Sequence, residues 1–95
     1  MLTGKQRAKL RAMANGVQAT FQIGKGGIGE NLLKQLDETL DARELIKISV
    51  LETADVEPKE ALDRLCEALR AEPVQAVGRK ITLYRRNYDA PKIEL

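Results

Sequence analysis

The sequence predicts an α+β fold of two layers, in which three helices pack on a four-stranded mixed sheet in the order αβαβαββ. Three observations lead to this prediction. Apolar residues recur with a helical period in three segments, they alternate with polar residues in shorter segments, and a glycine-containing turn separates two strands near the end. Strands connected through helices indicate parallel pairing, whereas the final hairpin adds an antiparallel pair, so the sheet is expected to be mixed.

The first helix is expected over residues 4–15. Thr3 followed by Gln6 has the spacing of a capping box, in which two side chains bond the backbone at a helix start. Apolar residues then follow at helical intervals, at Leu10, Met13, Ala14 and Val17. Gly16 comes directly after the expected helix and is typical of a helix end.

A strand and a second helix are expected on either side of a glycine-rich turn. Apolar residues alternate with polar ones, as in a half-buried strand, at Ala19, Phe21 and Ile23. The turn at residues 24–29 holds four of the seven glycines. A helical stripe then continues to about Ala42 and consists of Ile28, Leu32, Leu33, Leu36 and Leu40.

The next strand and the third helix follow from the same periodicities. Residues 45–51 predict a strand whose inward face is formed by Ile46, Ile48 and Val50. Pro58 suits the first turn of a helix, because its fixed φ fits that position and its missing N–H is not needed there. Apolar spacing carries this third helix to about Ala71.

Two short strands complete the expected fold. They cover residues 74–77 and 81–85 and are joined across Gly78-Arg79-Lys80 as a tight hairpin. Residues 1–86 are therefore expected to form a single domain, and residues 87–95 a loosely held tail.

The composition excludes several kinds of site. There is no histidine, and Cys66 and Ser49 are the only cysteine and serine, so catalytic Ser-His-Asp and Cys-His arrangements are absent. We expect no enzyme activity, no metal, no cofactor and no small-molecule substrate. A single thiol fits a reducing compartment, and no apolar run approaches the roughly 18 residues of a membrane span. The sequence therefore predicts a cytoplasmic protein without membrane contact.

The charges are segregated along the chain. The first 27 residues carry five cations and no acid, residues 28–72 carry twelve acids against six cations, and residues 73–95 carry five cations against two acids. Such asymmetry is typical of a surface that faces a polyanion, provided that the basic ends meet in the fold. We expect both basic ends to surround the exposed glycine turn. The acidic central segment leaves a second interpretation open, in which the protein is an adaptor that docks another protein through its acidic helices.

The glycine-rich turn predicts an anion site. Backbone N–H groups without side chains in front of them lie beside the positive end of the next helix, so a phosphate can approach closely. Gly24, Gly26 and Gly29 match the G-x-G-x-x-G pattern of dinucleotide-binding folds, and Glu52 lies where an acid would meet a ribose. A nucleotide-binding fold is therefore an alternative, although the chain is short for one.

The same turn also matches a shorter pattern. Gly24-Lys25-Gly26-Gly27 is a G-x-x-G sequence with a cation between the glycines, and KH domains clamp a nucleic-acid backbone with such a loop. Phe21 follows the apolar phase of its strand, which leaves Tyr84 and Tyr88 as the only other rings. An RRM-like platform of two or three stacked bases is therefore excluded, and recognition is expected to depend on phosphates and RNA shape.

The first helix supports a polyanionic partner independently. Its like-charged pairs Lys5–Lys9 and Arg7–Arg11 are four residues apart, which destabilises an isolated helix by roughly 0.2–0.5 kcal/mol per pair. All four cations are expected toward the helix end where the dipole disfavours positive charge. A negatively charged partner would relieve both effects.

Four blocks of residues taken together resemble the CRM domain family, named for chloroplast RNA splicing and ribosome maturation, and in particular its single-domain YhbY-like bacterial members. The blocks are LTGKQR at residues 2–7, GKGG at 24–27, RELIK at 43–47 and GRKITLYR at 78–85. The resemblance implies the αβαβαββ fold of the C-terminal domain of translation initiation factor three, RNA binding through the glycine loop and the adjacent basic surface, and association with precursors of the large ribosomal subunit.

The expected partner is therefore ribosomal RNA in such precursors. The residues expected to contact it are Gly24, Lys25, Gly26 and Gly27 in the loop, with Lys5, Lys9, Arg11, Arg79, Lys80, Arg85 and Arg86 extending the contact.

Overall fold

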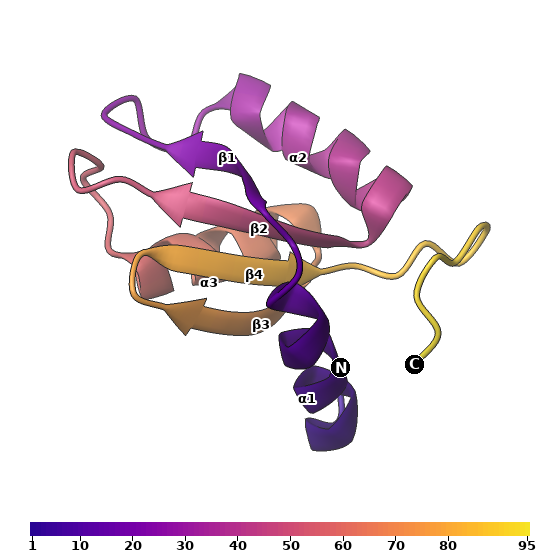
Figure 1. Ribbon diagram of the computed structural model, residues 1–95. Coiled ribbons are helices and arrows are strands. Elements are labelled where there is room, and N and C mark those ends of the chain that lie inside the picture. Colours follow the sequence, from indigo (N-terminus) through magenta and orange to yellow (C-terminus); the bar gives the residue numbers. More distant parts are fainter.

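The computed structural model describes residues 1–95 and has the predicted order of helices and strands (Figure 1). Its elements are α1 (Gly4–Ala14), β1 (Ala19–Ile23), α2 (Glu30–Arg43), β2 (Leu45–Val50), α3 (Pro58–Leu69), β3 (Glu72–Val77) and β4 (Lys80–Tyr84). The strands form one sheet in the spatial order β1-β2-β4-β3. Strand β1 pairs parallel to β2, while β4 pairs antiparallel to both β2 and β3, which confirms the mixed sheet.

Different segments of the chain leave the two ends of the sheet. At the first, which we call the loop end, Ile23 lies opposite Val50 and Ser49 lies opposite Lys80. The glycine loop, the β2–α3 loop and the β3–β4 turn therefore all leave the sheet there. At the other end, which we call the tail end, Leu45 lies opposite Tyr84, and the chain continues into the C-terminal tail. Figure 1 shows the three loops at one side of the sheet and the tail at the other.

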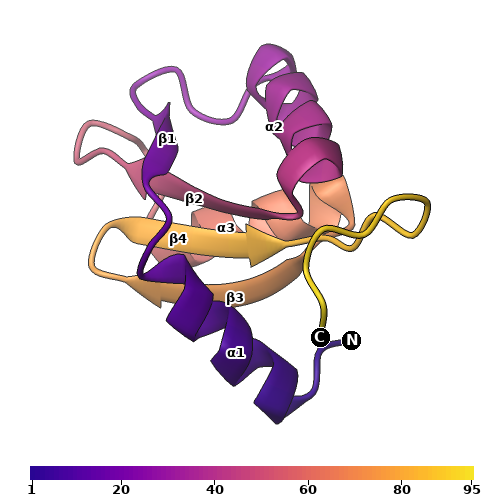
Figure 2. The same ribbon diagram turned by 45° about the vertical axis from the view of Figure 1, so that its right-hand side comes forward.

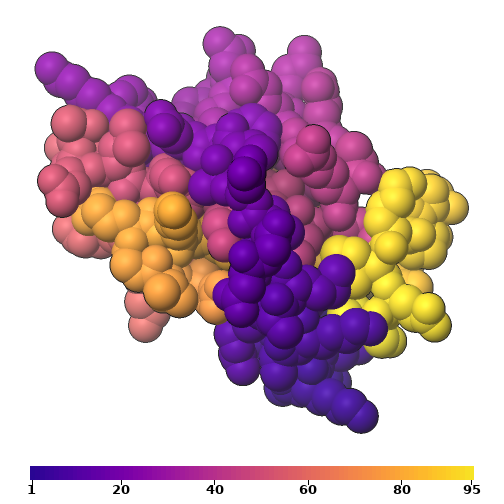
Figure 3. All heavy atoms as spheres, in the orientation of Figure 1, coloured from indigo at the N-terminus to yellow at the C-terminus, as the bar shows by residue number.

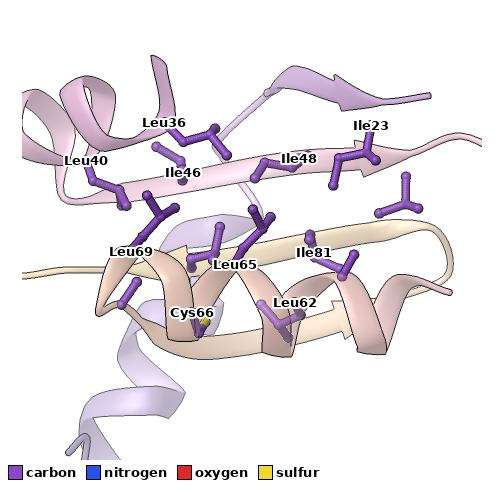
Figure 4. Packing of buried hydrophobic residues seen from close by; sticks show 14 of the residues in the cluster. Ile23, Leu36, Leu40, Ile46, Ile48, Leu62, Leu65, Cys66, Leu69 and Ile81 are labelled. Atoms are coloured by element: carbon purple, nitrogen blue, oxygen red, sulfur yellow. The ribbon is translucent and has the colours of Figure 1, made fainter. Parts of the chain in front are cut away.

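Helices cover both faces of the sheet, so the expected two layers are joined by a partial third. Helices α2 and α3 pack against one face, where Leu36, Leu65 and Ile48 belong to a core cluster of 15 buried residues (Figure 4). Helix α1 lies on the opposite face (Figures 1 and 2). There it forms a small separate core of Leu10, Leu45, Val74 and Tyr84. Periodicity showed which residues of α1 are apolar but not which face of the sheet they would cover.

Local signals placed most element boundaries correctly. The capping box of α1 is present, since Gln6 N–H donates to the Thr3 hydroxyl and Thr3 N–H donates to the Gln6 side chain. Helix α2 begins two residues later than its apolar stripe, because Ile28 packs on the core from the loop. Helix α3 ends at Leu69, since Arg70 turns into the left-handed region with φ of 55°. Strand β3 includes Pro73, which an edge strand tolerates.

The β3–β4 turn is tighter than expected. Val77 pairs with Lys80, so only Gly78 and Arg79 form the turn and Lys80 belongs to β4. Gly78 has φ of 59°, whereas Arg79 does not have a positive φ, and this combination is typical of a type II′ turn. Glycine is therefore required at the first turn position.

The C-terminal tail, which the sequence predicted to be loosely held, is fastened to a buried carboxylate. Glu44 follows α2 with φ of 68° and is 0% exposed. Its two oxygens accept hydrogen bonds from the backbone N–H groups of Asn87 (2.6 Å), Lys92 (2.6 Å) and Ile93 (2.7 Å). The side chains of Ile93 and Leu95 also pack against the small core beneath α1. The tail thus lies on the domain rather than away from it.

None of the three helices combines the length and the apolar character that a passage through a bilayer requires.

Candidate functional site

The glycine loop is an exposed turn with a lysine near its tip. Gly27 N–H donates to the carbonyl of Gly24 at 2.9 Å, which closes the turn and leaves Lys25 and Gly26 exposed. Gly27 has φ of 69°, a conformation that L side chains adopt at a cost. Figure 3 shows this purple segment protruding from the loop end of the molecule.

The backbone of the loop is accessible to a large anion. A Cβ atom placed on Gly26 or Gly27 would have no neighbour within 4 Å, so the space in front of these residues is open. Gly29 is the N-cap of α2 and provides no side-chain hydrogen bond, which leaves the first amides of the helix without a capping side chain. The N–H groups that stay free in such a turn, beside a helix N-terminus, are favourable for phosphate.

Arg79 connects the segments at the loop end through hydrogen bonds. Its Nε donates to the carbonyl of Val50 at 2.7 Å and its Nη2 to that of Leu51 at 3.0 Å. Leu51 N–H in turn donates to the Ile23 carbonyl, and the Leu51 side chain lies 3.5 Å from where a Cβ of Gly24 would be. The predicted contact residue Arg79 therefore uses two of its nitrogens to hold the loops together.

An open, polar part of the sheet adjoins the glycine loop. On the α1 side of the sheet, Gln22 lies opposite Ser49, and Ser49 lies opposite Lys80. Lys47 occupies the same face, and it lines a shallow hollow with Lys80 and with Asn15, which follows α1. We call Gln22, Lys47, Ser49 and Lys80 the open sheet face; it contains no acidic residue.

Lys47 was absent from the residues predicted to bind, although the strand periodicity already placed it opposite the buried face of its strand. The periodicity of one strand does not show which other strand pairs with it. Only the pairing of Lys47 with Thr82, next to the pairing of Ser49 with Lys80, brings the two lysines onto one surface.

The cations of α1 are divided between the two ends. Arg7 Nε donates to the carbonyl of Pro73, and Leu2 N–H donates to Glu72, so the helix starts near the tail end. Lys5 lies in that first part and is exposed, and Lys9 donates to the carbonyl of Glu94. Arg11 lies in the last turn, where the helix dipole favours a cation, so the expectation that all four cations lie at the unfavourable end is wrong for Arg11.

Arg85 and Arg86 lie at the tail end, away from the glycine loop. Arg85 is held within the protein, since its guanidinium donates to Asp37 and Asp41 at 2.7 and 2.9 Å and to the Leu69 carbonyl at 2.9 Å. Arg86 is exposed and lies over the ring of Tyr88. The expectation that both basic ends surround the glycine turn is therefore wrong for these two residues. The hairpin contributes Lys80 to that region, but not the arginines after it.

Other reactive groups do not form a site. Cys66 is buried among the residues of the main core, and burial raises the pKa of its thiol to about 12, so it is protonated at neutral pH. No group of three or more His, Cys, Asp or Glu side chains is placed to hold a metal ion.

The G-x-G-x-x-G alternative lacks its structural context. In dinucleotide folds the third glycine allows close packing of helix on strand, yet a Cβ on Gly29 would meet nothing within 4 Å. Those folds also use a mostly parallel sheet, whereas only β1 and β2 are parallel here. Glu52 lies exposed in the loop after β2.

Comparison with known proteins identifies the family. The sequence profile described as the CRS1 / YhbY (CRM) domain matches residues 2–85. The chain belongs to this family. A CRM domain thus accounts for nearly the whole chain, and the resemblance seen in the four sequence blocks is confirmed.

Individual proteins are similar to most or all of the chain. The chain is 42% identical over 95 residues to "Probable RNA-binding protein YqeI" of Bacillus subtilis, which covers 100% of this chain and 99% of that protein. It is 38% identical over 86 residues to a second protein with the name "Probable RNA-binding protein", from Methanocaldococcus jannaschii, with 88% of this chain and 63% of that protein covered. These relatives are named as RNA-binding proteins and not as enzymes.

A solved structure confirms the architecture. The solution structure of a hypothetical protein from Staphylococcus aureus matches with a TM-score of 0.83 and 49% sequence identity, covering 100% of this chain and 99% of the other.

Proposed function

We propose that this CRM domain binds RNA through the glycine loop and the open sheet face. The observation that carries this proposal is the position of Lys25, on an exposed turn of unobstructed amides, next to a sheet surface that contains lysines and no acid. The names of its curated relatives support RNA as the polyanion.

The glycine loop and the open sheet face offer different groups to an RNA strand. The amide of Gly26 and the ammonium of Lys25 would hold one phosphate, while Lys47 and Lys80 would neutralise phosphates farther along the strand. Gln22 and Ser49 offer neutral donors and acceptors to sugar hydroxyls or base edges. Because this face has no exposed ring, recognition there depends on the backbone and shape of the RNA.

The predicted contact residues differ in the support that the structure gives them. Gly24, Lys25, Gly26, Gly27 and Lys80 stay in the proposed interface and Lys47 joins them, with Arg11 at its margin. Lys5, Lys9 and Arg86 lie at or toward the other end of the protein. Arg79 and Arg85 act mainly as internal braces.

We expect the affinity for RNA to depend steeply on salt. For a single strand, the logarithm of the association constant should fall against that of the salt concentration with a slope of about −0.7 per neutralised phosphate. Lys25→Ala should flatten the slope by about one contact, and the exposed control Arg64→Ala on α3 should not. Titration of a labelled RNA hairpin with an unpaired loop measures both. Binding without salt dependence, or dinucleotide binding that RNA does not displace, would contradict the proposal.

The finer proposal is that the target is ribosomal RNA in precursors of the large subunit, as the family resemblance implies. We expect the protein to sediment with large-subunit precursors in a sucrose gradient of cell lysate at low salt, and to leave them as the salt is raised. A Lys25→Ala variant should shift toward the free fractions. Recovery of the wild-type protein only in free fractions, with intact precursors present, would contradict the assembly role but not RNA binding itself.

A further inference from the structure

A second hollow lies at the tail end, on the far side of the protein from the glycine loop. It has a volume of about 420 Å³, and its walls include Gln6, Arg70, Glu72, Tyr84, Arg86 and Tyr88. Such a volume is within the range of small-molecule sites. The function proposed above does not use this hollow, although two of its arginines are exposed.

Tyr88 is an exposed ring at this hollow. It is 83% exposed, and the guanidinium of Arg86 lies 5.4 Å from its ring centroid. A ring exposed to this degree is accessible to a ligand. Stacking of a nucleic-acid base on an aromatic ring, with an arginine close by, is a sequence-tolerant way to bind an unpaired nucleotide.

Tyr84 provides a second, independent observation. It is only 3% exposed, it lines the hollow, and its hydroxyl is buried without a hydrogen-bond partner. Buried hydroxyls nearly always have a partner, and the charge of Arg86 opposes the rise in the pKa of Tyr84 that burial causes, so the two side chains make this part of the wall polar.

The acid in the hollow is already neutralised in part. Glu72 accepts a hydrogen bond from Leu2 N–H at 2.8 Å and lies 3.8 Å from the terminal ammonium of Met1. Among the side chains of the walls, Arg70 and Arg86 are exposed cations without an acidic partner, and they favour an anionic ligand beside them.

The tail is built so that Tyr88 is held at this place. The amides that donate to Glu44 belong to Asn87 on one side of Tyr88 and to Lys92 and Ile93 on the other. Burying a carboxylate is unfavourable unless it is fully hydrogen-bonded. Glu44 therefore acts as a positioning residue, since its bonds fix the segment that carries Arg86 and Tyr88.

We infer that this hollow binds an unpaired nucleotide of the same RNA, with its base stacked on Tyr88 and its phosphate beside Arg86 and Arg70. The inference rests on the proposed RNA-binding function and extends it to a second contact. The two contacts are separated by the length of β2, roughly 17 Å at the usual rise per residue, so one folded RNA reaches both.

Replacement of Tyr88 tests the inference. Because stacking of a base on one aromatic ring contributes substantially to binding affinity, Tyr88→Ala should weaken binding of the labelled RNA hairpin about tenfold. Tyr88→Phe, which keeps the ring, should bind as the wild type does. Since Tyr88 is exposed, neither change should alter the melting temperature. Equal affinity of Tyr88→Ala and wild type, with Lys25→Ala still impaired, would overturn the second contact and leave the proposed function intact.

Tyrosine fluorescence gives a direct readout of stacking. The chain has two tyrosines and no tryptophan, so its emission comes from Tyr84 and Tyr88. The RNA hairpin should quench the wild type more strongly than Tyr88→Phe, because the remaining Tyr84 is buried and does not stack on the base. Equal quenching in both proteins would overturn stacking on Tyr88. Quenching by a free mononucleotide at the same concentration as by RNA would overturn the assignment to a nucleotide within an RNA chain.

Discussion

Replacing Lys25 and Gly26 together by aspartate is expected to weaken RNA binding about 100-fold, or about 2.7 kcal/mol, while the fold persists. The change removes one cation from the turn and places two carboxylates where the phosphate is proposed to lie, which adds repulsion to the lost attraction. The turn tolerates the change, because Lys25 is exposed and a Cβ on Gly26 meets no atom within 4 Å.

A control with the same change in net charge separates the site from the overall charge. Arg64→Glu/Ala68→Glu places the new carboxylates on exposed positions of α3, on the sheet face opposite the open sheet face. We expect this control to lose only a small part of the affinity. The proposed site would be contradicted if both double variants bound equally well in the RNA titration, with similar melting temperatures.

The largest effect on stability is expected from Glu44. Glu44→Gln should lower the free energy of unfolding by about 3 kcal/mol, because it removes the charge that three backbone N–H groups share and directs an NH₂ group toward those donors. Urea denaturation followed by circular dichroism measures the loss. In a chain that ends at residue 86 the donors are absent, so the same substitution should cost much less. An equal loss in both chains would show that Glu44 does not act through the tail.

The contribution of Glu44 should also depend on pH. Burial by itself raises the pKa of the carboxyl. Hydrogen bonds from Asn87, Ile93 and Lys92 and the charge of Arg86 lower it by a larger amount, so the pKa of Glu44 lies below its ordinary value of 4.5. A lowered pKa in the folded state means that the ionised form stabilises the fold above pH 4.5. The stability difference between wild type and Glu44→Gln should therefore shrink as the pH falls below 4.5. A difference that stays constant in acid would exclude the ionised carboxylate as its source.

The family comparison and the geometry support the RNA-binding proposal in different ways. Membership of the CRM family directs attention to RNA through the names of its relatives. The geometry then indicates which cations can contact RNA, because a turn with open amides, flanked by a surface without acidic residues, can approach a phosphate chain. Arg85 is an example of a cation that the sequence predicted to bind RNA but whose charge two acidic side chains of α2 already neutralise.

Much of the fold could be predicted from local patterns. The capping box at Thr3, the proline in the first turn of α3 and the glycines of the turns act over a few residues, so their effects can be read from adjacent positions. For the same reason, the order of helices and strands, the mixed sheet and the exposed glycine turn followed from the sequence.

Only the tertiary structure decided which charges lie together on an open surface and which are neutralised within the protein. Lys47 belongs to the proposed interface because a distant strand places Lys80 beside it, whereas the carboxylates of Asp37 and Asp41 bind Arg85. The face that α1 covers and the attachment of the tail to Glu44 were likewise settled by contacts between residues far apart in the chain. Periodicity records whether a side chain prefers water or the interior, but its partner depends on where the rest of the chain folds.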